Sequence, residues 1–128
     1  MKPSLNLTAK LQGAYWLLTG IWPFVHLRSF LWVTGPKEDI WLLYTVSVLI
    51  TVVGAVLLLA GFSRRVTPEI KWLGIAGAVG LAGIDSYYAL SDVIRNVYLL
   101  DAAGELVLVL LWVWAGKMEL STRVQKDI

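Results

Sequence analysis

The chain has no cysteine and a single histidine, His26. Without cysteine there are no disulfide bonds, thiolate nucleophiles or sulfur-ligated metal centres. One histidine without a second histidine or a cysteine makes a poor metal site, so we expect no metal and no cofactor. Charge is also scarce, at 16% of residues with a net value of +2, which argues against a polyanionic partner such as a nucleic acid.

Apolar residues, by contrast, make up 58% of the 128 residues, against roughly 45–50% in a soluble domain. They gather in four runs, at about 11–33, 40–61, 70–90 and 99–116. Each run approaches the roughly 20 residues that a helix needs to cross a hydrocarbon layer about 30 Å thick. No alternating pattern of a membrane β-barrel occurs. We therefore predict an all-α membrane protein with one domain over residues 1–128, built from four transmembrane helices.

The connectors between the runs predict where the helices begin and end. Thr34-Gly35-Pro36 ends the first run, and we expect Glu38 and Asp39 in the first turn of the next helix, where the helix dipole favours anions. Thr67-Pro68-Glu69 has the pattern of an N-cap followed by the first two helical positions. Connectors this short place successive helices antiparallel, so the prediction is an up-down-up-down bundle.

The distribution of lysine and arginine predicts the orientation. Eight of them fall on one side of the predicted bundle and three on the other. The positive-inside rule therefore places both termini in the cytoplasm. The first run leads into Pro23 and His26 without a small-x-small cleavage site, so we expect it to be retained as a helix.

Three ionisable residues fall at one depth in the predicted bundle. His26, Asp85 and Glu105 lie roughly 7–11 Å below the outer boundary, at about 1.5 Å per residue. Ionisable groups inside a membrane usually face the bundle or a cavity and mark functional sites. Two neighbouring buried carboxyls cannot easily both ionise, so one can rest protonated beside an ionised partner, as acid/base chemistry requires. We take these three residues as the candidate catalytic set. A purely structural hydrogen-bond network and, less favoured, a divalent-ion site remain alternatives.

Polar and aromatic residues recur every three or four positions on each predicted helix, which predicts one polar stripe per helix. From these stripes we take the candidate ligand-binding residues, which are Tyr15, Thr19, Trp22, Tyr44, Ser47, Tyr88, Asp101 and Trp112. A charged rim of Arg28, Asp92 and Arg95 would act as a gate above the pocket, or else form ordinary interfacial ion pairs. Gly74, Gly77, Gly80 and Gly83 predict either close packing of residues 70–90 inside the bundle or a homodimer seam.

The segment from Gly54 to Arg65, Gly-Ala-Val-Leu-Leu-Leu-Ala-Gly-Phe-Ser-Arg-Arg, resembles the helix ending of the DoxX-like group of small bacterial four-helix membrane proteins. The first run, with Gly20, Pro23 and His26 before a Gly-Pro turn, is also similar to that group, so the likeness covers about the first half of the chain. The sequence departs from it in having no acidic residue within 40–61. The resemblance implies a four-helix fold in a bacterial inner membrane. Some members are linked to quinone-coupled or redox systems, and no catalytic residue carries over.

We therefore expect a multi-pass inner-membrane protein with an acid/His pocket near the outer leaflet. The pocket would bind a small amphiphilic or lipid-like ligand and act on it by proton transfer, although the sequence does not decide whether the protein is an enzyme. The alternatives are a proton-coupled small transporter and a non-catalytic accessory subunit of a membrane complex. The expected partners are the lipid bilayer, the ligand, and either a second copy of the chain or another membrane protein.

Overall fold

The computed structural model describes residues 4–91 and 93–126, with side chains as far as Leu120. These residues form helices joined by short connectors, and no strand occurs among them. The helices are α1 (Leu5–Val25), α2 (Leu27–Thr34), α3 (Ile40–Phe62), α4 (Pro68–Leu90) and α5 (Val97–Lys126). The prediction of an all-α fold is confirmed.

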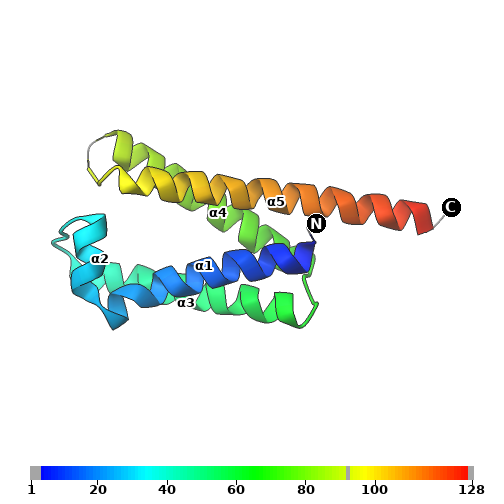
Figure 1. The fold of residues 1–128 in the computed structure, drawn as a ribbon, viewed down its shortest axis with the longest axis horizontal. Coiled ribbons are helices and arrows are strands. Elements are labelled where there is room, and N and C mark those ends of the chain that lie inside the picture. Colours follow the sequence, from blue (N-terminus) through cyan, green and yellow to red (C-terminus); the bar gives the residue numbers. More distant parts are fainter. Residues whose placement is uncertain (1–3, 92, 127–128) are drawn as a thin grey trace.

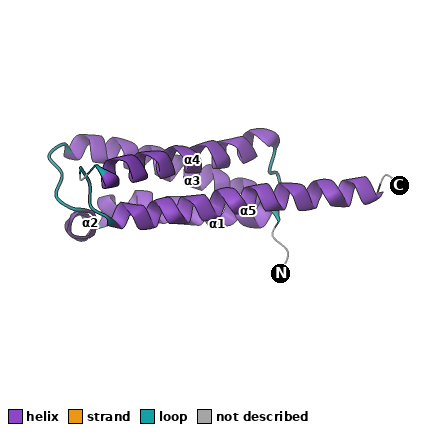
Figure 2. Cartoon of the chain, turned by 90° about the horizontal axis from the view of Figure 1, so that it is seen from above, coloured by secondary structure: helices purple, strands orange, loops and turns teal. Residues whose placement is uncertain are grey.

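The helices form two layers. α1 packs chiefly against α3, and α4 packs chiefly against α5, with fewer contacts between the two pairs. Figure 1 shows that α1 and α4 run in one direction while α3 and α5 run in the other, with α2 turned across one end. Figure 2 shows the same arrangement from above, with α5 continuing beyond the other helices toward the C-terminus. The described start of α1 lies at the end of the bundle opposite α2.

Side-chain caps explain several helix boundaries. Thr67 caps α4 by accepting a hydrogen bond from the Ile70 N–H at 3.3 Å, with Pro68 in the first turn, as predicted. Asp39 precedes α3 as its N-cap and makes no side-chain capping hydrogen bond, so the placement of Glu38 and Asp39 in the first turn was wrong. The chain has already turned at Gly35, whose φ of 98° suits a residue without a β-carbon.

The helix predicted over residues 11–33 is two helices, because the chain leaves helical geometry at His26 (φ −151°, ψ 82°). The backbone N–H of His26 still donates to the Trp22 carbonyl at 2.9 Å and closes α1. The His26 imidazole Nδ1 then accepts from the Ser29 N–H at 3.2 Å and caps α2. Pro23, which lacks a backbone N–H, weakens the last turn of α1 just before this break.

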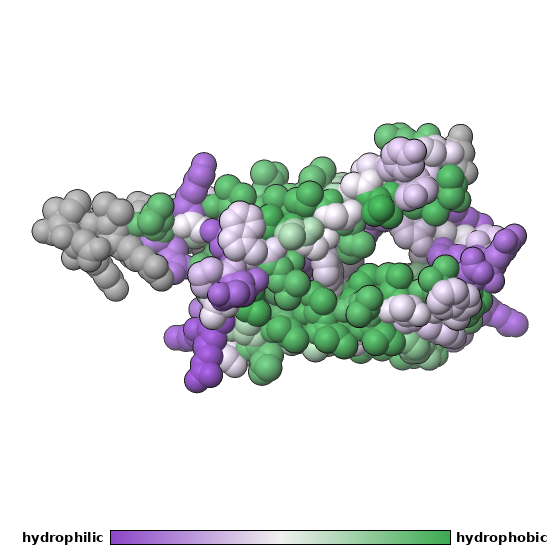
Figure 3. Space-filling view, turned by 180° about the vertical axis from the view of Figure 1, so that it is seen from behind, coloured by the Kyte–Doolittle hydropathy of each residue, from purple (hydrophilic) through white to green (hydrophobic). Residues whose placement is uncertain are grey.

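Three helices are long and apolar enough to cross a membrane: α3, α4 and the Val97–Leu120 part of α5. α1 has 21 residues but carries Asn6, Lys10 and Gln12 in its first half, and it is not among them. Figure 3 shows a broad hydrophobic belt across one face of the molecule, with hydrophilic groups collected toward its ends. The fold therefore has the surface pattern of a membrane protein, with three of its helices meeting the length and composition for a span.

The closest helix contact lies between α1 and α3, where Gly13 and Gly54 bring the two backbones together. A β-carbon on Gly54 would lie 2.6 Å from the Leu17 backbone nitrogen and 2.9 Å from the Gly13 carbonyl oxygen. The glycines of α4 were predicted to pack inside the bundle or against a second copy. Gly74 lies against the Trp112 indole, but a β-carbon on Gly80 would meet no atom within 4 Å.

A polar network joins the two layers in the half of the bundle farther from α2. The Trp112 Nε1–H donates to Gln12 Oε1 at 2.6 Å, and Gln12 Nε2 donates to the Gly74 carbonyl at 3.0 Å. Both Trp112 and Gln12 are fully buried, and Trp112 packs with Ala9 and Leu57 in the core. These groups hydrogen-bond one another, so the burial of their polar atoms between the layers is compensated.

Candidate functional site

A cavity of about 500 Å³, the inner chamber, lies between the two layers. All five helices contribute side chains to its wall. Figure 3 shows the molecule hollowed between its layers near the end that carries α2. The closed network around Trp112 and this open half therefore divide the bundle into a packed part and a hollow part.

Three carboxyl groups line the inner chamber: Asp85 from α4, and Asp101 and Glu105 one turn apart on α5. Two consecutive residues of α1 hold the pair on α5. The Tyr15 hydroxyl donates a hydrogen bond to Asp101 Oδ1, and the Trp16 Nε1–H donates to both Glu105 oxygens, at 2.9 and 3.3 Å. The carboxyls on α5 are thus positioned by donors from the opposite layer.

Asp85 has a different environment. Its side chain is only 5% exposed, and its Oδ2 has no hydrogen-bond partner. Asp101 and Glu105 of α5 line the same chamber as Asp85. A buried polar atom without a partner is costly, so it marks a position where a ligand group or a proton is expected.

No lysine, arginine or histidine lines the inner chamber in the part of the chain that the structure describes. The three carboxyls therefore face one another without a compensating cation from the protein. Ionised carboxyls in one low-dielectric cavity repel one another, so this arrangement favours a positively charged guest or the protonated forms of the carboxyls. Residues 4–91 and 93–126 contain no cluster of histidine, cysteine or acidic side chains arranged to hold a metal ion.

Aromatic and aliphatic side chains form the rest of the inner chamber. Trp22 packs edge-on against Phe30 of α2, with ring centroids 5.3 Å apart, and its Nε1–H donates to Ser29 Oγ at 2.9 Å. Tyr98 of α5 closes the wall facing α2 and α3. The chamber is therefore mainly apolar with a few convergent polar groups, which is the usual composition of a small-molecule site.

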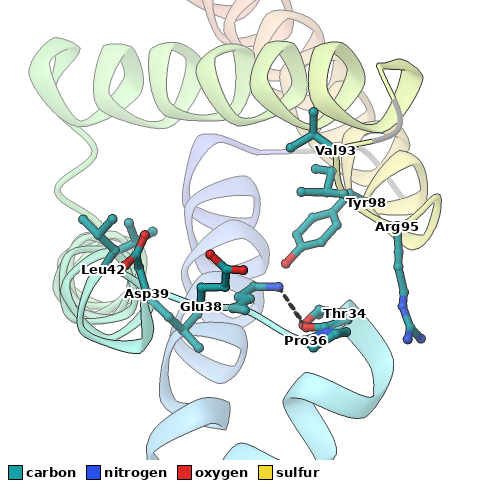
Figure 4. A pocket seen from close by; sticks show the side chains of 13 residues that line it. Thr34, Pro36, Glu38, Asp39, Leu42, Val93, Arg95 and Tyr98 are labelled. Atoms are coloured by element: carbon teal, nitrogen blue, oxygen red, sulfur yellow. Dashed lines mark hydrogen bonds between the residues drawn. The ribbon is translucent and has the colours of Figure 1, made fainter.

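A wider opening of about 980 Å³, the vestibule, adjoins the inner chamber and is shown in Figure 4. The two spaces share wall residues, namely Thr34, Leu43, Val46 and Tyr98. The Lys37 ammonium donates to Thr34 Oγ1 at 3.2 Å and lies 5.7 Å from the Phe30 ring centroid and 5.3 Å from that of Tyr98. A protein ammonium group therefore lies over two rings that also line the inner chamber.

The predicted charged rim is only partly at this opening. Arg95 belongs to the vestibule wall, but its side chain extends toward α2 (Figure 4), where Nη1 donates to the Trp32 carbonyl at 3.1 Å. Arg95 therefore ties α5 to α2, and its role as a gate stays a prediction. Arg28 is exposed on α2, and Asp92 lies outside the described residues. Lys37, a second cation of the outer rim, also lines the vestibule.

Four other predicted site residues lie away from the inner chamber. His26 is exposed at the α1–α2 break, where it caps α2, so it does not join Asp85 and Glu105. Tyr44 stacks on Phe24 with centroids 4.8 Å apart, Tyr88 packs edge-on against Tyr87, and Trp112 lies in the core. Residues three or four apart on a helix drift around its axis, so a long stripe spreads over more than one neighbour. The predicted residues that do line the chamber are Tyr15, Thr19, Trp22, Ser47, Asp85, Asp101 and Glu105.

Sequence reasoning missed Trp16, Phe30 and Tyr98 as chamber residues. Trp16 had a usable signal, because it follows the polar Gln12 by four residues and a buried indole N–H needs an acceptor. Phe30 was hidden by the assumption of one continuous helix over 11–33. The break at His26 turns α2 across the bundle and brings Phe30 to the end of the chamber.

No protein-family model matches this chain, and no curated protein or solved structure matches it. The features of the molecule itself therefore define its class. It is an all-helical protein with three helices suited to cross a membrane, and it encloses an acidic chamber with aromatic walls.

Proposed function

We propose that this chain is a multi-pass inner-membrane protein whose inner chamber binds a small amphiphilic or lipid-like molecule. The observation that carries the proposal is the chamber itself, about 500 Å³ with carboxyl groups set in a mainly apolar wall. The apolar wall suits the hydrophobic body of such a molecule, and the carboxyls suit its polar group. The hollow between the layers lies along the hydrophobic belt, which favours entry from the surrounding lipid (Figure 3).

The proposed topology has four spans, with α1 as the fourth and both termini in the cytoplasm. A helix of 21 residues is about 31 Å long, enough for a bilayer core. The antiparallel order of α1, α3, α4 and α5 supports an even number of crossings (Figure 1). The excess of lysine and arginine on the side of the termini supports their cytoplasmic placement. The first half of the chain resembles the DoxX-like group in sequence. The proposed four-span topology is the one that this resemblance implies.

In the proposed mechanism, Asp85 exchanges a proton with the polar group of the bound molecule. Its free Oδ2 is the available acceptor or donor position, and the neighbouring Asp101 can share the proton. Tyr15 and Trp16 position Asp101 and Glu105 through the hydrogen bonds they donate. His26 has no part in this step because it lies at the helix break.

Binding is favoured over transport by the packing of the other half of the bundle. The network of Gln12, Gly74 and Trp112 fills the space between the layers there with buried, mutually bonded groups. A transporter would need a polar path through this region. We therefore propose a site that exchanges its ligand on one side only.

The absence of cysteine allows a direct test by single-cysteine labelling. Ser47 is 4% exposed and lines the inner chamber, whereas Ala78 is fully buried and lies outside the chamber wall. In purified protein reconstituted into nanodiscs, a small methanethiosulfonate reagent should modify Ser47→Cys and leave Ala78→Cys unmodified.

The same assay then asks whether an amphiphile occupies the chamber. Three probes share a phenylbutyl body and carry a trimethylammonium, a hydroxyl or a carboxylate group. At least one probe should slow the modification of Ser47→Cys in a saturable way. Equal modification of the two variants, or protection by none of the probes, would contradict the proposed function.

A further inference from the structure

We propose that the occupant of the inner chamber is an organic cation, either a protonated amine or a quaternary ammonium group with an apolar body. This inference rests on the proposed function, because it names the class of amphiphile that the chamber takes. The first observation behind it is charge. Three carboxyl groups line the chamber, and no lysine, arginine or histidine of the described residues joins them.

The second observation is the free oxygen of Asp85. The side chain is 5% exposed, it lines the chamber, and its Oδ2 has no partner, whereas Asp101 and Glu105 are already held by Tyr15 and Trp16. A carboxylate oxygen can only accept a hydrogen bond or face a positive charge. The unfilled position in this chamber therefore suits a donor or a cation, and it would repel an anion.

The third observation is the aromatic wall. The rings of Phe30 and Tyr98 belong to the inner chamber and at the same time lie under the Lys37 ammonium in the vestibule. Ring faces attract ammonium groups, most strongly where water is excluded. One ammonium group of the protein already lies over these rings, which shows that the same rings that line the chamber can contact a positive charge.

Charge balance gives the inference a pH dependence. The titratable groups facing the chamber are Asp85 from α4, Tyr15 from α1, and Tyr98, Asp101 and Glu105 from α5, while α2 and α3 contribute none. The nearest protein cation is Lys37 in the vestibule. A cation that enters replaces protons held by the carboxyl cluster, so binding releases protons and becomes tighter as the pH rises.

The test compares phenylbutyltrimethylammonium with its neutral isostere, in which a tert-butyl group replaces the trimethylammonium group. Binding is measured at equilibrium on the full chain in nanodiscs, with empty nanodiscs as the partition blank. We expect saturable binding of the cation at least about tenfold tighter than that of the isostere. The affinity for the cation should rise with pH, while that for the isostere stays constant.

Charge-removing variants complete the test. Asp85→Asn should weaken binding of the cation about tenfold or more and leave the isostere unchanged. Asp101→Asn serves as a second variant if the first fails to fold. Glu69→Gln is the matched control, because Glu69 is an exposed carboxyl at the other end of the same helix, and it should bind the cation like the wild type.

The outcomes separate this inference from the proposed function. If the isostere binds as tightly as the cation, or if Asp85→Asn and Asp101→Asn keep wild-type affinity for the cation, the ligand class is wrong although the chamber still binds an amphiphile. If neither the cation nor the isostere binds in a saturable way, the proposal of an organic cation is also overturned. Protection of Ser47→Cys by the hydroxyl or carboxylate probe then decides independently whether the proposed function survives.

Discussion

The carboxyl of Asp85 should cost the protein stability, which leads to an unusual prediction for a core residue. Asp85→Asn is expected to raise the free energy of unfolding of the ligand-free protein. Asn keeps the size and shape of the side chain but removes a charge from a position that is 5% exposed and lacks a cation. The new amide N–H₂ group is a donor in a chamber whose other polar groups, Asp101 and Glu105, are acceptors.

The magnitude follows from the groups involved. Leaving a buried polar atom without a partner costs about 1–3 kcal/mol, and a typical hydrogen bond contributes about 1 kcal/mol. Because the new amide also needs a second acceptor, we expect a net gain near the lower end, about 1–2 kcal/mol. Stability lost at a binding site and regained when that site is removed is a common trade-off.

The assay is reversible unfolding in mixed micelles of a mild detergent and sodium dodecyl sulfate, followed by helical circular dichroism. Glu69→Gln removes an exposed carboxyl from the first turn of the same helix, where the helix dipole favours an anion, and should lower the free energy of unfolding by about 0.3–1 kcal/mol. If Asp85→Asn lowered the free energy of unfolding as much as Glu69→Gln or more, Asp85 would be a satisfied structural residue. The reasoning about its free oxygen would then be refuted.

Four further predictions use the same unfolding assay. Gly54→Ala should lower the free energy of unfolding by about 1–3 kcal/mol, because its β-carbon would lie 2.6 Å from the Leu17 backbone nitrogen. Gly80→Ala should raise the free energy of unfolding by about 0.5–1 kcal/mol, because the new carbon would meet no atom within 4 Å. Equal effects of Gly54→Ala and Gly80→Ala would argue against the close α1–α3 contact. Arg64→Gly should raise the free energy of unfolding by about 0.5–1 kcal/mol, because Arg64 follows α3 with a positive φ of 55° that glycine adopts more easily. Arg64→Ala is the control, and equal stability of the two variants would contradict this prediction. Trp112→Phe should lower the free energy of unfolding by at least about 1–3 kcal/mol, because Gln12 loses the indole donor at 2.6 Å, and a neutral result would show that the network does not hold the two layers together.

The sequence was sufficient for most of the fold. The apolar runs predicted the positions of α3 and α4 to within two residues at each end, because the flanking caps are local signals. Thr67 and Pro68 are the clearest case. The short connectors predicted α1 and α3 as antiparallel neighbours, but the close approach of their backbones at Gly13 and Gly54 was not predicted. It depends on which faces of two helices meet, and the glycines of α4 offered an equally plausible interface in the sequence.

The site was predictable only in part. Asp85 and Glu105 were chosen by depth in the membrane, and both line the inner chamber, because topology and helical rise together determine depth. The same reasoning misplaced His26, since depth was counted along a continuous helix and the chain breaks at that very residue. Lys37 belongs to a connector, where no periodic pattern exists to place a side chain.

The most direct test of the acidic chamber is the ¹⁵N-indole NMR spectrum of the protein as an amphiphile is added. The chain has seven tryptophans, which report on different surroundings. Trp16 and Trp22 line the inner chamber, whereas Trp72 and Trp114 are exposed on the outer surface. With phenylbutyltrimethylammonium, we expect saturable shifts of the Trp16 and Trp22 signals, which Asp85→Asn weakens. Shifts confined to Trp72 and Trp114 that grow without saturation would show partition onto the hydrophobic surface, and would contradict binding in the chamber.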